Sequence, residues 1–279
     1  MAQGDLTRIA SNITGLNALN ALKAVNTQLN IHQLRLSTGK RINEAADDPA
    51  GLTIATKLNY KSRGLGVALD NIGDAKNLLG VAEGSLSKIS DILLLIRDKA
   101  EQAANDTLSD AERQAISSQI QALVTEIDTI VDETEWNGKA LIDGSLSSMT
   151  FQTGFQTFAK TDVQSTIFAA HDSSTLGIAT VDVMSYTSAI AYMGSVDKAL
   201  ASVSSTLKDI GALVSRLTFK EENLTVAKTN TEAAYNRIMN ADIAAEQLEA
   251  MKYQILQQTA TAMLAQANVA PQAVLGLFR

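Results

Sequence analysis

The stretch Ile72–Ala103 reads IGDAKNLLGVAEGSLSKISDILLLIRDKAEQA. Its apolar residues recur at alternating steps of three and four, and Leu65 and Ala68 extend the series toward the N-terminus. Such a heptad pattern is typical of a helix that packs lengthwise against other helices. At ~1.5 Å per residue this seam is on the order of 55–60 Å long, so it needs partner helices of similar length. The seam residues are Ile72, Ala75, Leu79, Ala82, Leu86, Ile89, Leu93, Ile96, Ala100 and Ala103.

Two later segments supply such partners. Asn105–Asp110 interrupts the first helix, and Ser109 with Glu112 forms a capping-box pattern that starts the second. A third series follows later, with Glu221 as its one polar position. The middle of the chain therefore predicts three long helices in a slender bundle. Their apolar positions are Ile116, Ile120, Leu123, Ile127 and Ile130, and then Val196, Leu200, Val203, Leu207, Ile210, Val214, Leu217 and Leu224.

The two ends of the chain predict a second, thinner helix pair. The N-terminal stripe contains His32, stops at Ser37–Gly39, and is followed by Asp48 and Pro49, which suit a cap and a first helical residue. We expect Pro271 to close the C-terminal stripe. Thinly amphipathic helices are marginal alone, so we predict that both ends are disordered in the free monomer and fold on association. The stripes are Leu22, Val25, Leu29 and Leu36, and Leu248, Met251, Ile255 and Ala262.

Residues 145–189 break the helical pattern, because they are rich in Ser and Thr and hold most of the Phe residues. Short strands are expected at Phe151–Phe158, Ile167–Ala170 and Ile178–Met184, and Trp136-Asn137-Gly138 is a turn signal at the boundary. The fold class is thus mainly α: a long antiparallel helical bundle with a small β-hairpin region and paired termini.

Composition narrows the function classes. The net charge of −7 leaves no basic surface for nucleic acid or an anionic membrane, and the absence of Cys removes thiolate zinc sites and Cys nucleophiles. The longest strongly apolar run, Ile92–Ile96, is far too short for a membrane span. The first residues lack the pattern of a cleaved secretory signal, so none is expected.

Four blocks of sequence resemble the terminal signatures of bacterial flagellins. Residues 35–52 read RLSTGKRINEAADDPAGL and match the N-terminal signature. Residues 241–246 (ADIAAE), 257–268 (QQTATAMLAQAN) and 271–279 (PQAVLGLFR) match the C-terminal one. Trp136-Asn137-Gly138 falls where that family has an aromatic-Asn-Gly turn. Only about 45 residues separate the helical halves, so the resemblance is to the short type that lacks large outer domains.

The resemblance implies a non-enzymatic subunit of the extracellular flagellar filament, used for motility and exported by the flagellar type III apparatus without a cleaved signal. It implies a helical homopolymer as the product, and an export chaperone, a filament cap and hook-junction proteins as partners. Residues 1–43 with 238–279 would form an inner-core coiled coil, 44–144 with 190–237 an outer-core bundle, and 145–189 an exposed β excursion. The two terminal stripes would drive self-assembly, and the bend between layers would contain Gly39, Arg41, Asn43, Asp47 and Asp48.

Other chemistry is weakly supported by the sequence. His32 and His171 are too far apart in sequence to define a metal site, and His32 is better explained as a polar register residue in a seam. Asp47 and Asp48 are better explained as turn and cap residues than as a catalytic dyad. Glycines at 64, 66, 73, 80 and 84 are scattered through a heptad pattern, and we expect them to permit close helix contact or bending. No cofactor is expected.

One segment bears on host recognition. In flagellins seen by the vertebrate Toll-like receptor, the first long helix carries an Arg-x-Arg-Glu-Leu pattern. Here Leu95 replaces the first Arg, Arg97 is kept, Asp98 keeps the charge of Glu, and Lys99 replaces Leu. Because Leu cannot mimic a guanidinium contact, weak receptor activation is predicted.

Three further questions stay open at this point. A hook–filament junction protein or another axial flagellar protein would share the terminal heptads, and a soluble coiled-coil adaptor would explain the seams alone. The Ser/Thr-rich region is either O-glycosylated or an unmodified polar loop.

Overall fold

The structure is a computed structural model that describes residues 12–146, 148–156, 160–163 and 167–276. In this part of the chain helices dominate, and the strands form two short antiparallel pairs. The helices are α1 (Ile13–Thr38), α2 (Pro49–Ala103), α3 (Asp110–Glu133), α4 (Tyr186–Met239) and α5 (Ile243–Gly276). The strands are β1 (Glu135–Trp136), β2 (Lys139–Ala140), β3 (Met149–Gln152) and β4 (Lys160–Val163).

The chain divides into two compact units. One unit comprises Met1–Tyr60 with Asn230–Arg279, and the other comprises Lys61–Thr229. The long helices α2 and α4 contribute residues to both units. None of the helices in the described residues is long and apolar enough to span a bilayer.

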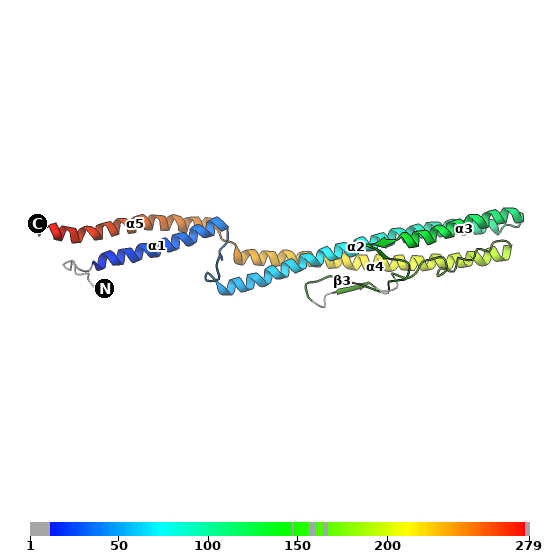
Figure 1. The fold of residues 1–279 in the computed structure, drawn as a ribbon, viewed down its shortest axis with the longest axis horizontal. Helices are drawn as coiled ribbons and strands as arrows, with labels where there is room; N and C mark the ends of the chain where they lie inside the picture. Colours follow the sequence, from blue (N-terminus) through cyan, green and yellow to red (C-terminus); the bar gives the residue numbers. More distant parts are fainter. Residues whose placement is uncertain (1–11, 147, 157–159, 164–166, 277–279) are drawn as a thin grey trace. The chain divides into compact units, whose positions relative to one another are not determined.

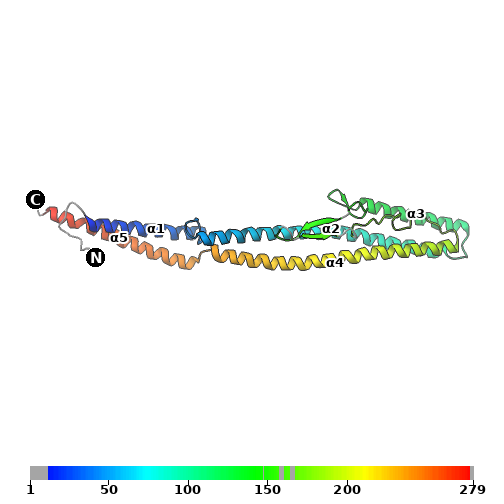
Figure 2. The ribbon, with the colours of Figure 1, turned by 90° about the horizontal axis from the view of Figure 1, so that it is seen from below.

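The core of the Lys61–Thr229 unit is a bundle of α2, α3 and α4, which lie side by side in two perpendicular views (Figures 1 and 2). All ten seam residues expected on α2 are fully buried, so the heptad prediction is confirmed. On α3 and α4 each expected position is either buried or half-buried, and Val124, Val131, Ala199 and Leu213 complete the core beside them.

Local signals set the ends of these helices. Ser109 accepts the backbone N–H of Glu112, while the Glu112 carboxylate accepts the Ser109 N–H at 2.7 Å, which completes the expected capping box. Asn137 and Gly138 both have positive φ, 51° and 73°, as a two-residue type I′ hairpin turn requires. This turn joins β1 to β2 and brings Trp136 and Lys139, the residues on either side of it, into an antiparallel pair.

The β region differs from the expectation. Strand β3 occupies Met149–Gln152 and pairs with Lys160–Val163, whereas residues 157 and 158 of the expected Phe151–Phe158 strand lie outside the described residues. Neither Ile167–Ala170 nor Ile178–Met184 forms a strand. Phe168 and Ile178 are instead buried in the bundle core, so these apolar side chains are removed from water by packing on the helices and not by strand pairing.

Specific polar contacts hold the β3–β4 hairpin and the following loop on the bundle. The Asn71 amide donates to the Gln152 carbonyl at 2.8 Å, and the Lys220 ammonium donates to the Thr153 hydroxyl. Further along, the buried His171 contacts the Ala169 carbonyl through Nδ1 and the Thr206 hydroxyl through Nε2.

The glycines of α2 divide into two groups. A Cβ at Gly64 would lie 2.4 Å from the ring of Phe155, so this glycine does permit a close approach. At Gly73, Gly80 and Gly84 a Cβ would meet nothing within 4 Å. No neighbour within the described chain approaches these three residues, so they serve no close contact inside one subunit, and the alternative role in bending stays a prediction.

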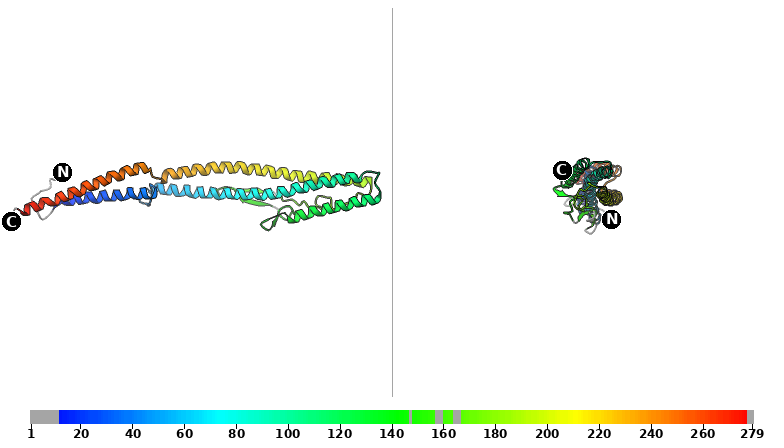
Figure 3. Two further views of the ribbon diagram at one scale, coloured as in Figure 1. Left: turned by 90° about the horizontal axis from the view of Figure 1, so that it is seen from above. Right: turned by 90° about the vertical axis from the view of Figure 1, so that its right-hand side faces the viewer.

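In the other unit α1 and α5 run antiparallel beside each other, and the start of α1 lies near the end of α5 (Figure 3). Asn12 caps α1 through the Gly15 N–H, and its side-chain amide donates to the Ala267 carbonyl at 3.1 Å. Helix α5 continues through Pro271 to Gly276, so the expectation that Pro271 ends it is wrong.

Candidate assembly interface

The seam between α1 and α5 is narrow. Among its described residues only Gly15, Leu29 and Ala250 are buried. Polar pairs supplement this thin contact: the Gln257 amide donates to Asn26 Oδ1 at 2.7 Å. Burial of so few apolar groups contributes little free energy to the pair. The predicted need of these helices for a further neighbour is thus consistent with the packing.

The residues expected to drive assembly fall into two groups. Leu22, Val25 and Leu36 are half-buried and Leu29 is buried on α1, so this stripe faces the seam. The α5 stripe is exposed: Leu248 by 66%, Met251 by 43% and Ile255 by 63%, with Ala262 also exposed. The side of α5 that contacts α1 is instead formed by Glu246, Ala250, Tyr253, Gln257, Ala260 and Leu264.

The outer surface of the pair is almost uncharged. From Gln254 to Gly276 helix α5 contains no acidic, basic or His residue, and Lys23 is the one charge between Ile13 and Ile31 of α1. Large apolar side chains are exposed on the same helices. An extended apolar surface without charges is characteristic of a protein–protein contact, not of a surface kept in water. These side chains are Ile13, Leu16, Leu34, Ile243, Leu248, Met251, Ile255, Leu256, Met263 and Val269.

An apolar groove also opens between the two helices. Its volume is about 390 Å³, and we call it the alanine groove. It is lined by Thr14, Asn17, Ala18, Ala21, Ala260, Met263 and Ala267. Sequence reasoning missed it, although the small residues at 18, 21, 260 and 267 were the available signal.

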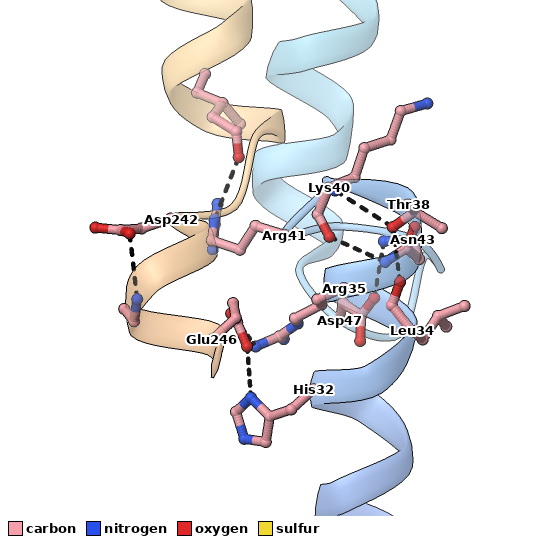
Figure 4. A network of polar contacts seen from close by, with 12 residues as sticks. His32, Leu34, Arg35, Thr38, Lys40, Arg41, Asn43, Asp47, Asp242 and Glu246 are labelled. Carbon is pink, nitrogen blue, oxygen red and sulfur yellow. Dashed lines mark hydrogen bonds and ion pairs between the residues drawn. The ribbon is translucent and has the colours of Figure 1, made fainter. Parts of the chain in front are cut away.

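A polar cluster fixes the register near the other end of the pair. His32 Nδ1 lies 2.5 Å from Glu246 Oε2, and the Arg35 guanidinium lies 3.4 Å from the other carboxylate oxygen (Figure 4). The His32 ring stacks on Tyr253 with a centroid separation of 5.2 Å. His32 thus pairs α1 with α5 in one register, as expected of a polar residue within a seam.

The bend after α1 is tied to the segment between α4 and α5. Gly39 adopts φ 68° and caps α1 by donating its N–H to the Arg35 carbonyl, as expected of a C-terminal glycine. Its own carbonyl accepts the Ala241 N–H at 3.0 Å, and the Arg41 N–H donates to the Met239 carbonyl at 2.7 Å. Two segments about 200 residues apart are therefore joined backbone to backbone.

The acidic residues of the bend are occupied in local structure. One Asp47 oxygen accepts the backbone N–H groups of Asn43 and Glu44, and these bonds hold the pKa of Asp47 below its usual range. Asp48 accepts the Gly51 N–H at 2.8 Å and the Arg41 guanidinium at 3.2 Å, which lower its pKa likewise. Both groups favour the ionised form that caps a helix or turn.

A small core lies under the bend. Ile42 is 2% exposed and packs with Ala55 and Met239, and Leu52, Tyr235 and Ile238 surround them. Sequence reasoning did not single out Ile42, although one large apolar residue within the polar run Gly39–Asp48 was a signal. The bend is thus held by both a hydrogen-bonded ladder and a buried aliphatic contact.

The segment that resembles the receptor pattern lies on the exposed side of α2. Leu95 is exposed by 53%, and its neighbour Asp98 is also exposed. Arg97 Nε donates to Asp197 of α4 at 2.8 Å, while Lys99 is half-buried. The one retained guanidinium is therefore engaged in an ion pair within the bundle.

The described residues contain no group of three or more His, Asp and Glu side chains arranged to hold a metal ion. His32 and His171 each contact other partners, in separate units. The α1–α5 pair offers an extended surface for association. The polar clusters beside it join segments that are distant in the sequence.

Comparisons with known proteins agree with this description. Residues 9–147 match the family model described as "Bacterial flagellin N-terminal helical region", and residues 193–278 match "Bacterial flagellin C-terminal helical region". A flagellin of Halalkalibacterium halodurans is 36% identical over 270 residues, which cover 95% of this chain and 98% of the relative. A flagellin of Bacillus subtilis is 36% identical over 98% of this chain and 100% of its own length.

A solved structure shares the fold. It is described as that of a flagellar hook-associated protein from Vibrio parahaemolyticus, and it matches with a TM-score of 0.61 over 70% of this chain and 100% of its own. At 15% identity this likeness concerns the fold alone. The family models and the nearly full-length relatives decide the identity: the chain belongs to the bacterial flagellins, the self-polymerising structural subunits of the extracellular flagellar filament, and is not an enzyme.

Proposed function

We propose that this subunit polymerises by covering the outer surface of its α1–α5 pair with neighbouring copies. The observation that supports this most directly is the exposed, uncharged α5 stripe on a unit with little core of its own. In this proposal residues 1–43 and 238–279 form the inner layer of the filament, and residues 44–144 with 190–237 form the outer bundle. Gly39, Arg41, Asn43, Asp47 and Asp48 set the bend between them.

The expected contribution of one stripe residue follows from its exposure. Full burial of an Ile side chain is worth ~1.5–3 kcal/mol. Ile255 is 63% exposed, so covering it in the filament contributes about 1–2 kcal/mol per contact. That free energy corresponds to a change of roughly 5–30-fold in the concentration of free subunit at equilibrium.

Seeded polymerisation tests this proposal. Purified chain is mixed with sheared filament fragments, and filaments are followed by pelleting, electron microscopy and circular dichroism. We expect long tubes of uniform diameter with a rise in helicity. Ile255→Gln is expected to raise the critical concentration ~5–30-fold, whereas Ile255→Leu, which keeps the apolar volume, stays near the starting value. An unchanged critical concentration for Ile255→Gln refutes the role of the stripe.

We further propose that the N-terminal end is read for export by the flagellar type III apparatus, and that an export chaperone, the filament cap and hook-junction proteins bind the terminal helices. The family resemblance supports this proposal. Deleting residues 1–40 is expected to abolish secretion in a flagellated strain, and undiminished export contradicts it. Weak activation of the host Toll-like receptor is proposed on the sequence of the Leu95–Lys99 segment, and full potency in reporter cells contradicts it.

A further inference from the structure

The α1–α5 pair carries two surfaces of matching chemistry and opposite shape. The first is the α5 stripe, in which Leu248, Met251 and Ile255 project large aliphatic side chains from one helix face. The second is the alanine groove, whose volume is about 390 Å³. A cavity of ~150 Å³ holds one benzene-sized apolar group, so the groove has room for more than one aliphatic side chain. Ridges of one helix packing into a groove is the usual geometry of helix association.

The charges near the two surfaces do not oppose contact between them. No charged residue lines the alanine groove. The two charges beside the stripe, Glu249 and Lys252, form an ion pair with each other at 2.9 Å. The stripe therefore presents no unpaired charge that would have to be desolvated in an apolar groove.

The positions of the two surfaces exclude self-contact within one copy. From Met251 to Met263 the continuous helix α5 advances about 18 Å, at ~1.5 Å per residue. With 3.6 residues per turn, the groove residues of α5 also point roughly 120° around the helix axis from the stripe. A rigid helix cannot bring these two surfaces together, so the stripe can reach such a groove only on another copy.

We propose that the α5 stripe of one copy enters the alanine groove of a second copy that is displaced along the helix axis by about 18 Å. The inference rests on the proposed assembly surface and adds the occupant of the groove and the direction of the contact. Because donor and acceptor surfaces differ, the contact is heterologous and does not close on itself. Repetition of the same heterologous contact from copy to copy builds an open assembly of subunits.

The absence of Cys from the chain permits a clean cross-linking test. We combine Met251→Cys in the stripe with Ala21→Cys in the groove, within one chain, and copolymerise it with seeds under oxidising conditions. Disulfides form only where the Cα atoms lie within ~7 Å. A non-reducing gel of filaments is expected to show a ladder of dimers, trimers and larger species. Mixed filaments of the two single variants are expected to show heterodimers alone.

A matched control uses Leu256→Cys, an exposed position roughly 140° around the helix axis from Met251, which is expected to give no cross-link with Ala21→Cys. Homodimers through Met251→Cys overturn the proposal, because they indicate a closed contact between like surfaces. Normal filaments without the 21–251 cross-link also overturn it while leaving filament assembly intact. Failure of the unsubstituted chain to polymerise on seeds refutes the proposed assembly surface itself.

Discussion

Two glycines allow the same substitution to be tested with opposite expected signs. Gly39 ends α1 with φ 68°, whereas Gly80 lies inside α2, and a Cβ added at either residue meets nothing within 4 Å. Packing therefore contributes nothing to the difference, and only the backbone conformation matters. Left-handed φ costs a residue with a Cβ roughly 1–2 kcal/mol. In a helix interior Ala is more stable than Gly by ~0.8–1.0 kcal/mol.

Gly39→Ala is expected to raise the critical concentration for polymerisation ~5–30-fold, because 1–2 kcal/mol of folded-state strain opposes assembly. Gly39→Asn is expected to cost less, since Asn tolerates the left-handed region. If the terminal helices fold only on assembly, the thermal unfolding of the free monomer stays unchanged in both variants. Critical concentrations are measured by seeded pelleting over a dilution series.

Gly80→Ala is the matched control. It is expected to raise the unfolding temperature of the monomer by ~2–4 °C, as about 1 kcal/mol does in a domain of this size. Equal critical concentrations for Gly39→Ala and the unsubstituted chain refute the argument. A lower unfolding temperature for Gly80→Ala also contradicts the argument. It would show that α2 requires a glycine at position 80 for a reason other than the space around it.

Three further outcomes follow from the contacts described. Burial lowers the pKa of His171, so on acidification its imidazole stays neutral in the native state while the unfolded chain takes up a proton. The free energy of unfolding is therefore expected to fall as the pH drops below about 6.5. His171→Gln is expected to flatten this pH dependence in thermal melts. Gly64→Ala places a Cβ 2.4 Å from the Phe155 ring and is expected to lower monomer stability by ~1–3 kcal/mol. In a double-mutant cycle, Phe155→Ala is expected to reduce this loss, and additive losses contradict the argument. Ile42→Ala removes the centre of the small core under the bend and is expected to destabilise the assembled state by ~2–5 kcal/mol, and filaments of normal critical concentration contradict it.

Repeating local patterns made the helices predictable. The α2 seam was identified residue by residue because burial on a long helix follows a fixed heptad spacing. Caps such as Ser109–Glu112 and Gly39 involve residues a few positions apart, so their contacts can also be inferred from local sequence. The flagellin signatures were recognised from the residues alone, without information on the fold.

The β region was predicted less well for a physical reason. Short apolar runs such as Ile167–Ala170 are compatible with a strand or with an irregular segment packed on helices. The choice depended on the helical bundle, in which Thr206 of α4 contacts His171 through its hydroxyl and the shared core contains Ile178. Such partners lie tens of residues away, and strand propensity yields to packing of this kind.

The sequence by itself determined which segments are helical, where α1 ends, where α2 and α3 begin, and the family to which the chain belongs. Tertiary structure alone decided which face of α5 meets α1, because that helix carries apolar residues on more than one face. The deciding contacts, His32 with Glu246 and Gln257 with Asn26, join residues more than 200 positions apart. The same packing left Leu248, Met251 and Ile255 in the open and created the alanine groove, since burial of one face of a helix exposes the other.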